Sequence, residues 1–206
     1  MTLLLIRHGE TPLNVARVLQ PMDTPLSARG VEQAHALARR LAGMGITAIL
    51  SSDLPRAHHT ATLIAAATGA PIESSALLHE RNFGDWRGLP YDQLPRDPLT
   101  MTEAAPAGES AAAFEARAAQ AFALIVQRGT ETDGALAVVT HGLLIGVLLG
   151  RHAHLPSGLV LPTHLGNTSL SVLAKAPPHT ATLLNSTTHL DAGPGLADDQ
   201  RALSGG

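Results

Sequence analysis

The sequence predicts an α/β protein built as three layers, an α/β/α sandwich with a mainly parallel sheet between two layers of helices. Short apolar runs of strand length alternate along the chain with longer segments of helical periodicity. Polar side chains follow directly after several of these runs, at the strand ends where open α/β sheets bind ligands. A chain of 206 residues, 45% hydrophobic, is expected to form one domain over 1–190, with 191–206 as a flexible tail.

The composition excludes several classes of function. A net charge of −3 argues against a nucleic-acid or anionic-membrane partner, and 2% aromatic residues leave little for stacking on bases. There is no cysteine, so disulfides, thiolate metal sites and thiol nucleophiles are excluded. The first apolar run is too short for a signal peptide or a membrane anchor, which favours a cytoplasmic location. Nothing in the composition sets a subunit number.

The first predicted strand, residues 3–6, ends in Arg7-His8-Gly9. The guanidinium of arginine offers a planar fork of donors that suits phosphate. Neutral imidazole is a nucleophile that can carry a transferred group. The pair therefore suggests phosphoryl transfer through His8, although a histidine in this place is more often structural when it stands alone.

The next segment is expected as a loop, a helix, a strand and a second helix. Residues 11–25 are rich in turn formers, and Ser27 is a typical N-cap for the amphipathic pattern that follows. Residues 46–50 form a second apolar run, and Pro55 suits the first turn of the next helix. Arg56 would then lie at a helix N-terminus, where free N–H groups favour an anion; the alternative is a solvated surface residue.

The middle of the chain supplies a carboxylate and a covering loop. A third strand is expected at 71–75, followed by a polar loop that holds Glu80 and the only tryptophan, Trp86. Glycines around Trp86 suggest an ordered loop that packs over something. Residues 89–107 contain four prolines and no clear period, so they predict a lid where substrate choice is made.

The last part repeats the arrangement of the first strand. A packing helix is expected from Ser110 to Gly129, and the strand 135–139 then runs into His141 before an apolar helix at 143–149. His141 would thus stand at a strand end and a helix start, where phosphate is favoured. The remaining elements are expected as two antiparallel edge strands, 170–174 and 180–185.

Near its start, the chain has the string Arg7-His8-Gly9-Glu10-Thr11, followed by Asn14. This string resembles the signature of the histidine phosphatase superfamily, which includes the cofactor-dependent phosphoglycerate mutases. Three later strings match that family in the same order: Ser51-Ser52-Asp53-Leu54-Pro55-Arg56-Ala57, Glu80-x-x-Phe83-Gly84-x-Trp86-x-Gly88, and Val138-x-x-His141-Gly142. The resemblance covers roughly residues 1–175. It implies a phosphoglycerate mutase-like fold and a phosphohistidine intermediate, and it requires neither a metal nor a cofactor.

The resemblance also implies a role for each residue. His8 would be the nucleophile and Glu80 the proton donor, while Arg7, Arg56 and His141 would hold the phosphoryl oxygens. Weaker candidates for substrate or phosphate binding are Asn14, Gln20, Ser52, Gly142 and Asn167. The other histidines do not have the spacing of a metal site.

The expected function is that of a phosphomonoesterase acting on a small phosphorylated metabolite. A phosphoglycerate mutase is the first alternative, but mutases of the family carry a basic insertion for the substrate carboxylate, and 89–107 contains only Arg96 and no lysine. The Glu80 string also resembles the α-ribazole phosphatases. A non-catalytic phosphate-binding module is the alternative of another class, yet such modules commonly lose the nucleophile or an arginine, and this chain keeps them all.

Overall fold

The computed structural model describes residues 2–191, and its centre is one six-stranded sheet. The strands are β1 (Thr2–Arg7), β2 (Ile46–Ser51), β3 (Ile72–Ser74), β4 (Ala135–Thr140), β5 (Leu170–Ala174) and β6 (Ala181–Ser186). The α-helices are α1 (Pro12–Val15), α2 (Ala28–Leu41), α3 (Pro55–Thr68), α4 (Ala111–Glu131) and α5 (Gly142–His152). Short 3₁₀ turns lie at η1 (Ala76–Leu78), η2 (Gly84–Trp86), η3 (Tyr91–Gln93) and η4 (Thr188–Leu190).

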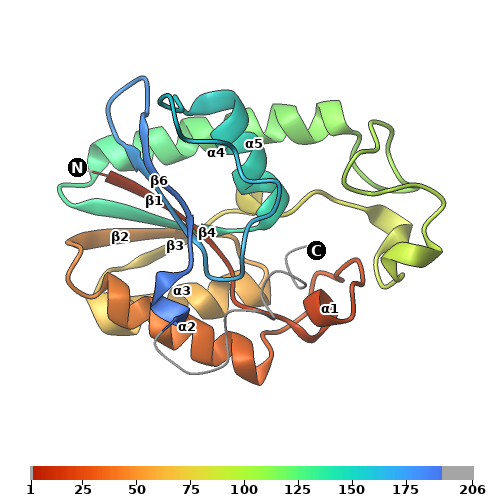
Figure 1. Ribbon diagram of the computed structural model, residues 1–206, viewed down its shortest axis with the longest axis horizontal. Coiled ribbons are helices and arrows are strands. Elements are labelled where there is room, and N and C mark those ends of the chain that lie inside the picture. Colours follow the sequence, from red (N-terminus) through yellow and green to blue (C-terminus); the bar gives the residue numbers. More distant parts are fainter. Residues whose placement is uncertain (1, 192–206) are drawn as a thin grey trace.

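The helices form a layer on each side of the sheet. Figure 1 shows α2 and α3 below the strands and α4 and α5 above them. One apolar cluster joins strand residues to α4 and α5, and a second joins them to α2 and α3. The predicted three-layer architecture is therefore confirmed, and the predicted tail beyond residue 191 lies outside the described residues.

The strand order is β3-β2-β4-β1-β5-β6. β1 pairs in parallel with β4, and β2 pairs in parallel with both β4 and β3. β5 is antiparallel to β1 and to β6, so it alone runs against the other strands, and the sheet is mainly parallel as predicted.

The prediction that β5 is an edge strand is wrong. Its neighbours are β1 on one side and β6 on the other, and only β6 lies at the edge. The chain turns at Pro177-Pro178 and returns along the open side of β5, which covers it. Four of the five β5 residues are buried as a result.

The run Leu3-Leu4-Leu5-Ile6 is apolar throughout because β1 lies between β4 and β5 and is covered on both faces. Alternate side chains of a strand point to opposite faces. Leu3 and Leu5 join the cluster with α4 and α5, and Leu4 and Ile6 join the cluster with α2 and α3. This central position fixes the strand whose end carries Arg7 and His8.

Residues 11–25 are not the simple loop that was predicted, because they contain the single-turn helix α1. The Thr11 hydroxyl accepts a hydrogen bond from the Asn14 N–H, and the Asn14 side chain accepts one from the Thr11 N–H. This reciprocal capping box, with Pro12 in the first turn, starts the helix.

Two glycines let the loop after β1 lie directly on α2. A Cβ on Gly30 would lie 2.0 Å from the Glu10 carbonyl oxygen, and a Cβ on Gly9 would lie 2.5 Å from the Gly30 carbonyl oxygen. Ser27 caps α2 as predicted, by accepting from the Gly30 N–H, and it donates to the Glu10 carboxylate at 2.8 Å. The Gly9-Glu10 backbone that follows His8 is thus held against a rigid helix.

Between residues 2 and 191, no helix is both long enough and apolar enough to cross a membrane.

Candidate functional site

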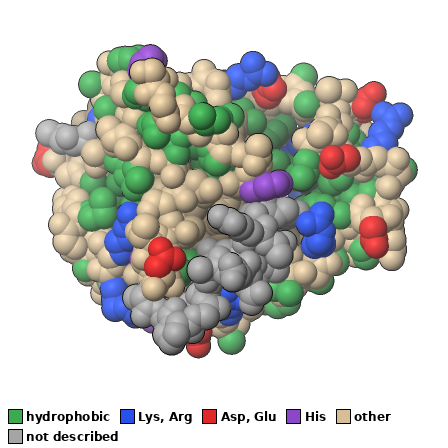
Figure 2. Space-filling model, in the orientation of Figure 1, with side chains coloured by type: hydrophobic (Ala, Val, Ile, Leu, Met, Phe, Trp, Pro, Cys, Tyr) green, Lys and Arg blue, Asp and Glu red, His purple; other side chains and the backbone are tan. Residues whose placement is uncertain are grey.

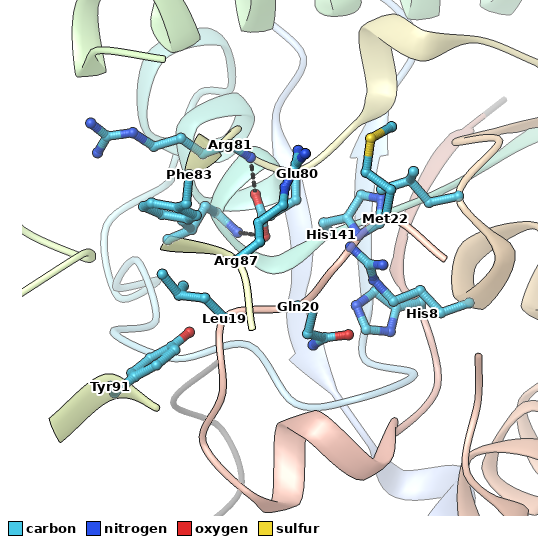
Figure 3. A pocket seen from close by; sticks show the side chains of 13 residues that line it. His8, Leu19, Gln20, Met22, Glu80, Arg81, Phe83, Arg87, Tyr91 and His141 are labelled. Atoms are coloured by element: carbon cyan, nitrogen blue, oxygen red, sulfur yellow. Dashed lines mark hydrogen bonds between the residues drawn. The ribbon is translucent and has the colours of Figure 1, made fainter. Parts of the chain in front are cut away.

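A cavity of about 40 Å³ opens at the sheet edge where β1, β2 and β4 end. It is lined by five of the residues that the sequence predicted for the site, His8, Gln20, Arg56, Glu80 and His141. In Figure 3, His8 and His141 lie together on one side of this cavity, and Glu80, Arg81 and Arg87 lie on the other. The nucleophile and the acid predicted for one reaction therefore share one cavity.

The backbone on both sides of His8 is tied to neighbouring segments. Its N–H donates to the Thr140 carbonyl at 3.0 Å, and its carbonyl accepts from the Thr168 N–H and the Asn167 side chain, each at 3.2 Å. The ring Nδ1 lies 2.7 Å from the Gly9 carbonyl oxygen. Because a carbonyl can only accept, Nδ1 carries the proton, and Nε2 keeps its lone pair.

The environment keeps His8 neutral. Burial lowers the pKa of its imidazole well below the ordinary value, and the charges of Arg56 and Arg7 lower it further. The hydrogen bond to Gly9 acts in the opposite direction and is the smallest of these effects. A neutral imidazole with a free Nε2 is the form that attacks phosphorus.

His141 lies beside His8, with 5.1 Å between the ring centroids. Its Nε2 is 2.9 Å from the Ser52 hydroxyl, and its Nδ1 is buried with no hydrogen-bond partner among residues 2–191. Burial lowers the pKa of His141 well below the ordinary value, with Arg56 next in effect. The unpartnered nitrogen leaves His141 able to bind a ligand atom, and Ser52 serves to orient the ring.

Arg56 lies in the first turn of α3, as predicted, but it is not a surface residue. Its side chain is 3% exposed, and it donates to the Pro21 carbonyl at 3.3 Å. Burial is the main cause that lowers its pKa to about 10, so it remains a cation at neutral pH. Its Nε has no hydrogen-bond partner in the described part of the chain, which leaves a buried donor next to His8.

Arg7 stands behind the cavity and does not line it. The residue is 1% exposed, and its guanidinium donates to the Leu165 carbonyl and packs against Gly142, where an added Cβ would lie 3.5 Å from Nε. Burial lowers its pKa, and Glu80 raises it. Arg7 therefore adds positive charge next to His8, and Gly142 leaves room for its side chain.

Each carboxylate oxygen of Glu80 accepts one backbone N–H. Oε1 accepts from Arg81 at 3.0 Å and Oε2 from Leu143 at 2.9 Å, as the dashed lines in Figure 3 mark. Burial raises the pKa of Glu80 above its ordinary value, against the opposing effects of these two bonds and of the nearby arginines. The first turn of α5 was predicted to bind phosphate. Its Leu143 N–H donates to the Glu80 carboxylate instead.

Arg81 fastens the Glu80 segment to the covering loop. Its guanidinium donates to the carbonyls of Met101 at 2.8 Å, Glu103 at 3.0 Å and Glu109 at 3.2 Å. The three acceptors lie 20 or more residues further along the chain. The segment 89–107 is thereby tied to the residue that follows the acid.

Arg117 holds the same segment from the other side. It projects from α4 and donates to the carbonyls of Leu77 at 2.9 Å, His79 at 2.8 Å and Glu80 at 3.1 Å. Its remaining donors pair with the Glu109 carboxylate, each at 2.8 Å. The helix predicted only for packing thus also positions the acid.

The weaker candidates fall in two groups. Gln20 lines the cavity and contacts the Thr11 hydroxyl at 3.0 Å. Asn167 does not line it; its side chain bridges the His8 carbonyl and the Asn14 side chain, each at 3.2 Å. The Asn14 amide nitrogen is a buried donor with no hydrogen-bond partner among the described residues, so it remains available to a ligand.

Sequence reasoning missed three polar side chains of the cavity: Arg81, Arg87 and Tyr91. Arg81 and Arg87 lie within the glycine- and tryptophan-containing string that located Glu80, which was the available signal. With Arg56 they outnumber the one carboxylate of the cavity lining, so the cavity favours an anion. On the face of the molecule shown in Figure 2, by contrast, basic side chains are interspersed with acidic ones.

Among residues 2–191, no three His, Cys, Asp or Glu side chains are placed to hold a metal ion. The chemistry available to the described residues is therefore that of a neutral histidine, a carboxyl of raised pKa and a set of cations around one small cavity.

Comparison with known proteins agrees with this arrangement. The family model described as "Histidine phosphatase superfamily (branch 1)" matches residues 3–185. The "Probable phosphoglycerate mutase GpmB" of Yersinia pestis is 37% identical over 179 residues, which cover 81% of each chain.

Two solved structures are similar in fold and sequence. The α-ribazole phosphatase of Shigella flexneri has a TM-score of 0.75 and 29% identity, and the alignment covers 91% of this chain and 97% of that one. A mycobacterial glucosyl-3-phosphoglycerate phosphatase in complex with VO₃ has a TM-score of 0.71 and 32% identity, covering 84% of this chain and 90% of that one. The chain belongs to the histidine phosphatase superfamily.

Proposed function

We propose that the protein is a phosphomonoesterase that hydrolyses a small phosphorylated metabolite through a phosphohistidine. The observation that carries the proposal is the pairing of His8 and Glu80 across one cavity. His8 is held neutral with Nε2 free, and Glu80 is a buried carboxyl whose pKa is raised. A nucleophilic imidazole has to be neutral, and a raised pKa favours the protonated carboxyl that a general acid needs.

In the first step, Nε2 of His8 attacks phosphorus. The N–P bond forms as the P–O bond to the alcohol breaks, and Glu80 gives its proton to the leaving oxygen. Nδ1 of His8 keeps its proton throughout and donates it in a hydrogen bond to the Gly9 carbonyl. The products are a free alcohol, a phosphohistidine and an ionised Glu80.

In the second step, water replaces the alcohol. Ionised Glu80 takes a proton from the water, whose oxygen attacks phosphorus as the N–P bond breaks. Inorganic phosphate leaves, and both His8 and Glu80 return to their starting protonation states.

The charged arginines and the hydrogen-bonding groups around His8 would stabilise the transferring phosphoryl group. Arg56 and His141 carry buried nitrogens with no partner in the described chain, and Arg7 adds charge from behind. Preorganised donors of this kind stabilise charge that develops in a transition state. We assign phosphoryl binding to Arg56 and His141, with Asn14 and Gln20 as further contacts, and a supporting positive charge to Arg7.

The alcohol part of the substrate would extend toward a larger groove of about 740 Å³. This groove is lined by residues 16–17 and 90–99, and it shares Tyr91 with the catalytic cavity. It includes part of the segment expected to choose the substrate. The shared Tyr91 is consistent with one continuous site.

Mutase activity is the second candidate, supported by the likeness to the Yersinia protein. The charge of the covering segment argues for hydrolysis instead, since Arg96 is its only basic residue and pairs with Glu103 at 2.8 Å. Among phosphatases, the likeness to the α-ribazole phosphatase adds α-ribazole phosphate to the substrates to test.

The test is an assay of the purified chain against a panel of phosphomonoesters, with His8→Ala as the control. We expect release of inorganic phosphate from p-nitrophenyl phosphate and from one or more metabolites, and none from the variant. Isomerisation of 3-phosphoglycerate that depends on 2,3-bisphosphoglycerate, without net phosphate release, would replace the phosphatase by the mutase.

A further inference from the structure

Arg87 is a cation inside the cavity that the proposed reaction does not use. Its backbone is fixed from both sides: its N–H donates to the Gly84 carbonyl, and the next N–H, that of Gly88, donates to the Leu19 carbonyl at 2.7 Å. Its side chain is partly buried and lines the cavity together with His8 and Glu80. Among the described residues it makes neither a side-chain hydrogen bond nor an ion pair.

The charges around Arg87 leave it without compensation. Arg56 is close enough for the charge of Arg87 to lower its pKa. The carboxylate that acts on Arg87 is Glu109, whose oxygens are already taken by Arg117 and by the Asn82 N–H at 2.8 Å. A cation held beside another cation, with the carboxylate that acts on it already hydrogen-bonded to other groups, favours an anion that enters from outside.

Arg81 and Arg87 differ in what their guanidinium donors contact. Arg81 lines the same cavity, but its guanidinium donates to the backbone carbonyls of Met101, Glu103 and Glu109. Within residues 2–191, the Arg87 side chain makes no such hydrogen bonds to the backbone. Of the two arginines, it is the one that can give its donors to a ligand.

We propose that Arg87 binds a carboxylate of the substrate, so that the preferred substrates are short phosphorylated carboxylic acids. The inference rests on the proposed phosphatase function and names the substrate class of that site. One guanidinium matches one carboxylate with two parallel hydrogen bonds. A second phosphate would need several cations, as the proposed phosphoryl site has, and one arginine does not supply them. Because Arg87 lines the same small cavity as His8, a carboxylate bound to it would lie within a few bonds of the phosphorus.

The test uses two pairs of substrates that differ in a carboxylate: phosphoserine with phosphoethanolamine, and 3-phosphoglycerate with glycerol 3-phosphate. Phosphate release gives kcat/KM for the wild type, Arg87→Gln and Arg87→Lys. The matched control is Arg151→Gln, which removes an exposed arginine paired with Glu115 on the surface. Circular dichroism and melting temperature check that each variant is folded.

The wild type is expected to prefer the carboxylate member of each pair. Arg87→Gln should lower that preference by about 10- to 100-fold, the range of one charged hydrogen-bonded contact. Arg87→Lys should keep part of it, because the charge remains while the fork is lost. Arg151→Gln should keep the wild-type preference.

Three results would overturn the inference while leaving the phosphatase in place. These are wild-type hydrolysis of the two members of each pair at equal rates, an unchanged preference in Arg87→Gln, and an equal loss in Arg87→Gln on all four substrates and p-nitrophenyl phosphate. The last result would assign Arg87 to the phosphoryl group. Failure of the proposed function itself is a separate result, since the wild type would then hydrolyse none of the five compounds.

Discussion

The two sides of the cavity are built in different ways. His8, Arg56 and His141 stand at the ends of β1 and β4 and at the start of α3, so the sheet and its helices place them. Glu80, Arg81 and Arg87 belong to the segment 79–88, which contains one 3₁₀ turn and no strand. That segment is positioned by side chains, above all by the guanidinium of Arg117.

This difference suggests how the molecule divides its tasks. The side built on the sheet holds the proposed nucleophile, and its geometry depends on many backbone hydrogen bonds at once. The side built on the loop holds the proposed acid and the cation assigned to the substrate, and its position depends on the contacts of a few side chains. Changes on the first side should therefore abolish the reaction, while changes on the second should alter which substrates react and how fast.

The largest effect is expected on the sheet side. Arg56→Ala and Arg7→Ala should each lower kcat/KM. The expected fall corresponds to a loss of about 2–4 kcal/mol of transition-state stabilisation, the scale of a preorganised donor to developing charge. The measurement is kcat/KM on p-nitrophenyl phosphate, with melting temperature as the control for folding. A variant that kept nearly full activity would remove that arginine from phosphoryl binding.

On the loop side, Glu80→Gln should have an effect that depends on the leaving group. An alkyl phosphate needs a proton at its leaving oxygen, whereas p-nitrophenolate leaves readily without one. We expect kcat/KM to fall far more on glycerol 3-phosphate than on p-nitrophenyl phosphate. Equal losses on both would show that Glu80 is not the proton donor.

The comparison also predicts a pH profile. Neutral His8 is lost as pH falls through its pKa, and because that pKa lies well below 6.5, activity should persist when the pH drops through 6.5. Protonated Glu80 is lost as pH rises through its pKa, which burial raises above 4.5. The measurement is kcat/KM for an alkyl phosphate, corrected for ionisation of the substrate. The alkaline decline should vanish in Glu80→Gln, and a decline that persisted there would belong to another group.

The smallest effect is expected for Arg117, which positions Glu80 without lining the cavity. Arg117→Met should reduce kcat on an alkyl phosphate more than on p-nitrophenyl phosphate, by less than Glu80→Gln does, while Arg117→Lys should recover part of the loss. Arg128→Met on the same helix is the matched control, since Arg128 pairs with Glu73 and Glu131 on the surface. An equal loss on both substrates would indicate general destabilisation instead of a misplaced acid.

Sequence reasoning was successful where the signal is local. A buried run followed by Arg7-His8, and another followed by His141, indicate strand ends because each pattern spans fewer than about ten residues. The Ser27 cap and the Pro55 start were predictable for the same reason. These local patterns were enough to place the sheet side of the cavity.

The missed features depend on contacts between distant residues. Arg117 donates to a carbonyl 40 residues earlier in the chain, and Arg81 donates to one 28 residues later. No local periodicity carries that information. The place of β5 likewise depended on where the chain returns after Pro178. Helix α1 is the exception, because its reciprocal cap is a local contact between Thr11 and Asn14 that the turn formers of the segment concealed.

The most direct test of the account is detection of the covalent intermediate. Turnover of a phosphomonoester should be quenched rapidly at alkaline pH, where phosphohistidine survives, and the peptides should then be analysed by mass spectrometry. The account predicts a phosphoryl group on His8, with none in His8→Ala. Phosphorylation of another residue during turnover, with His8 unmodified, would contradict it.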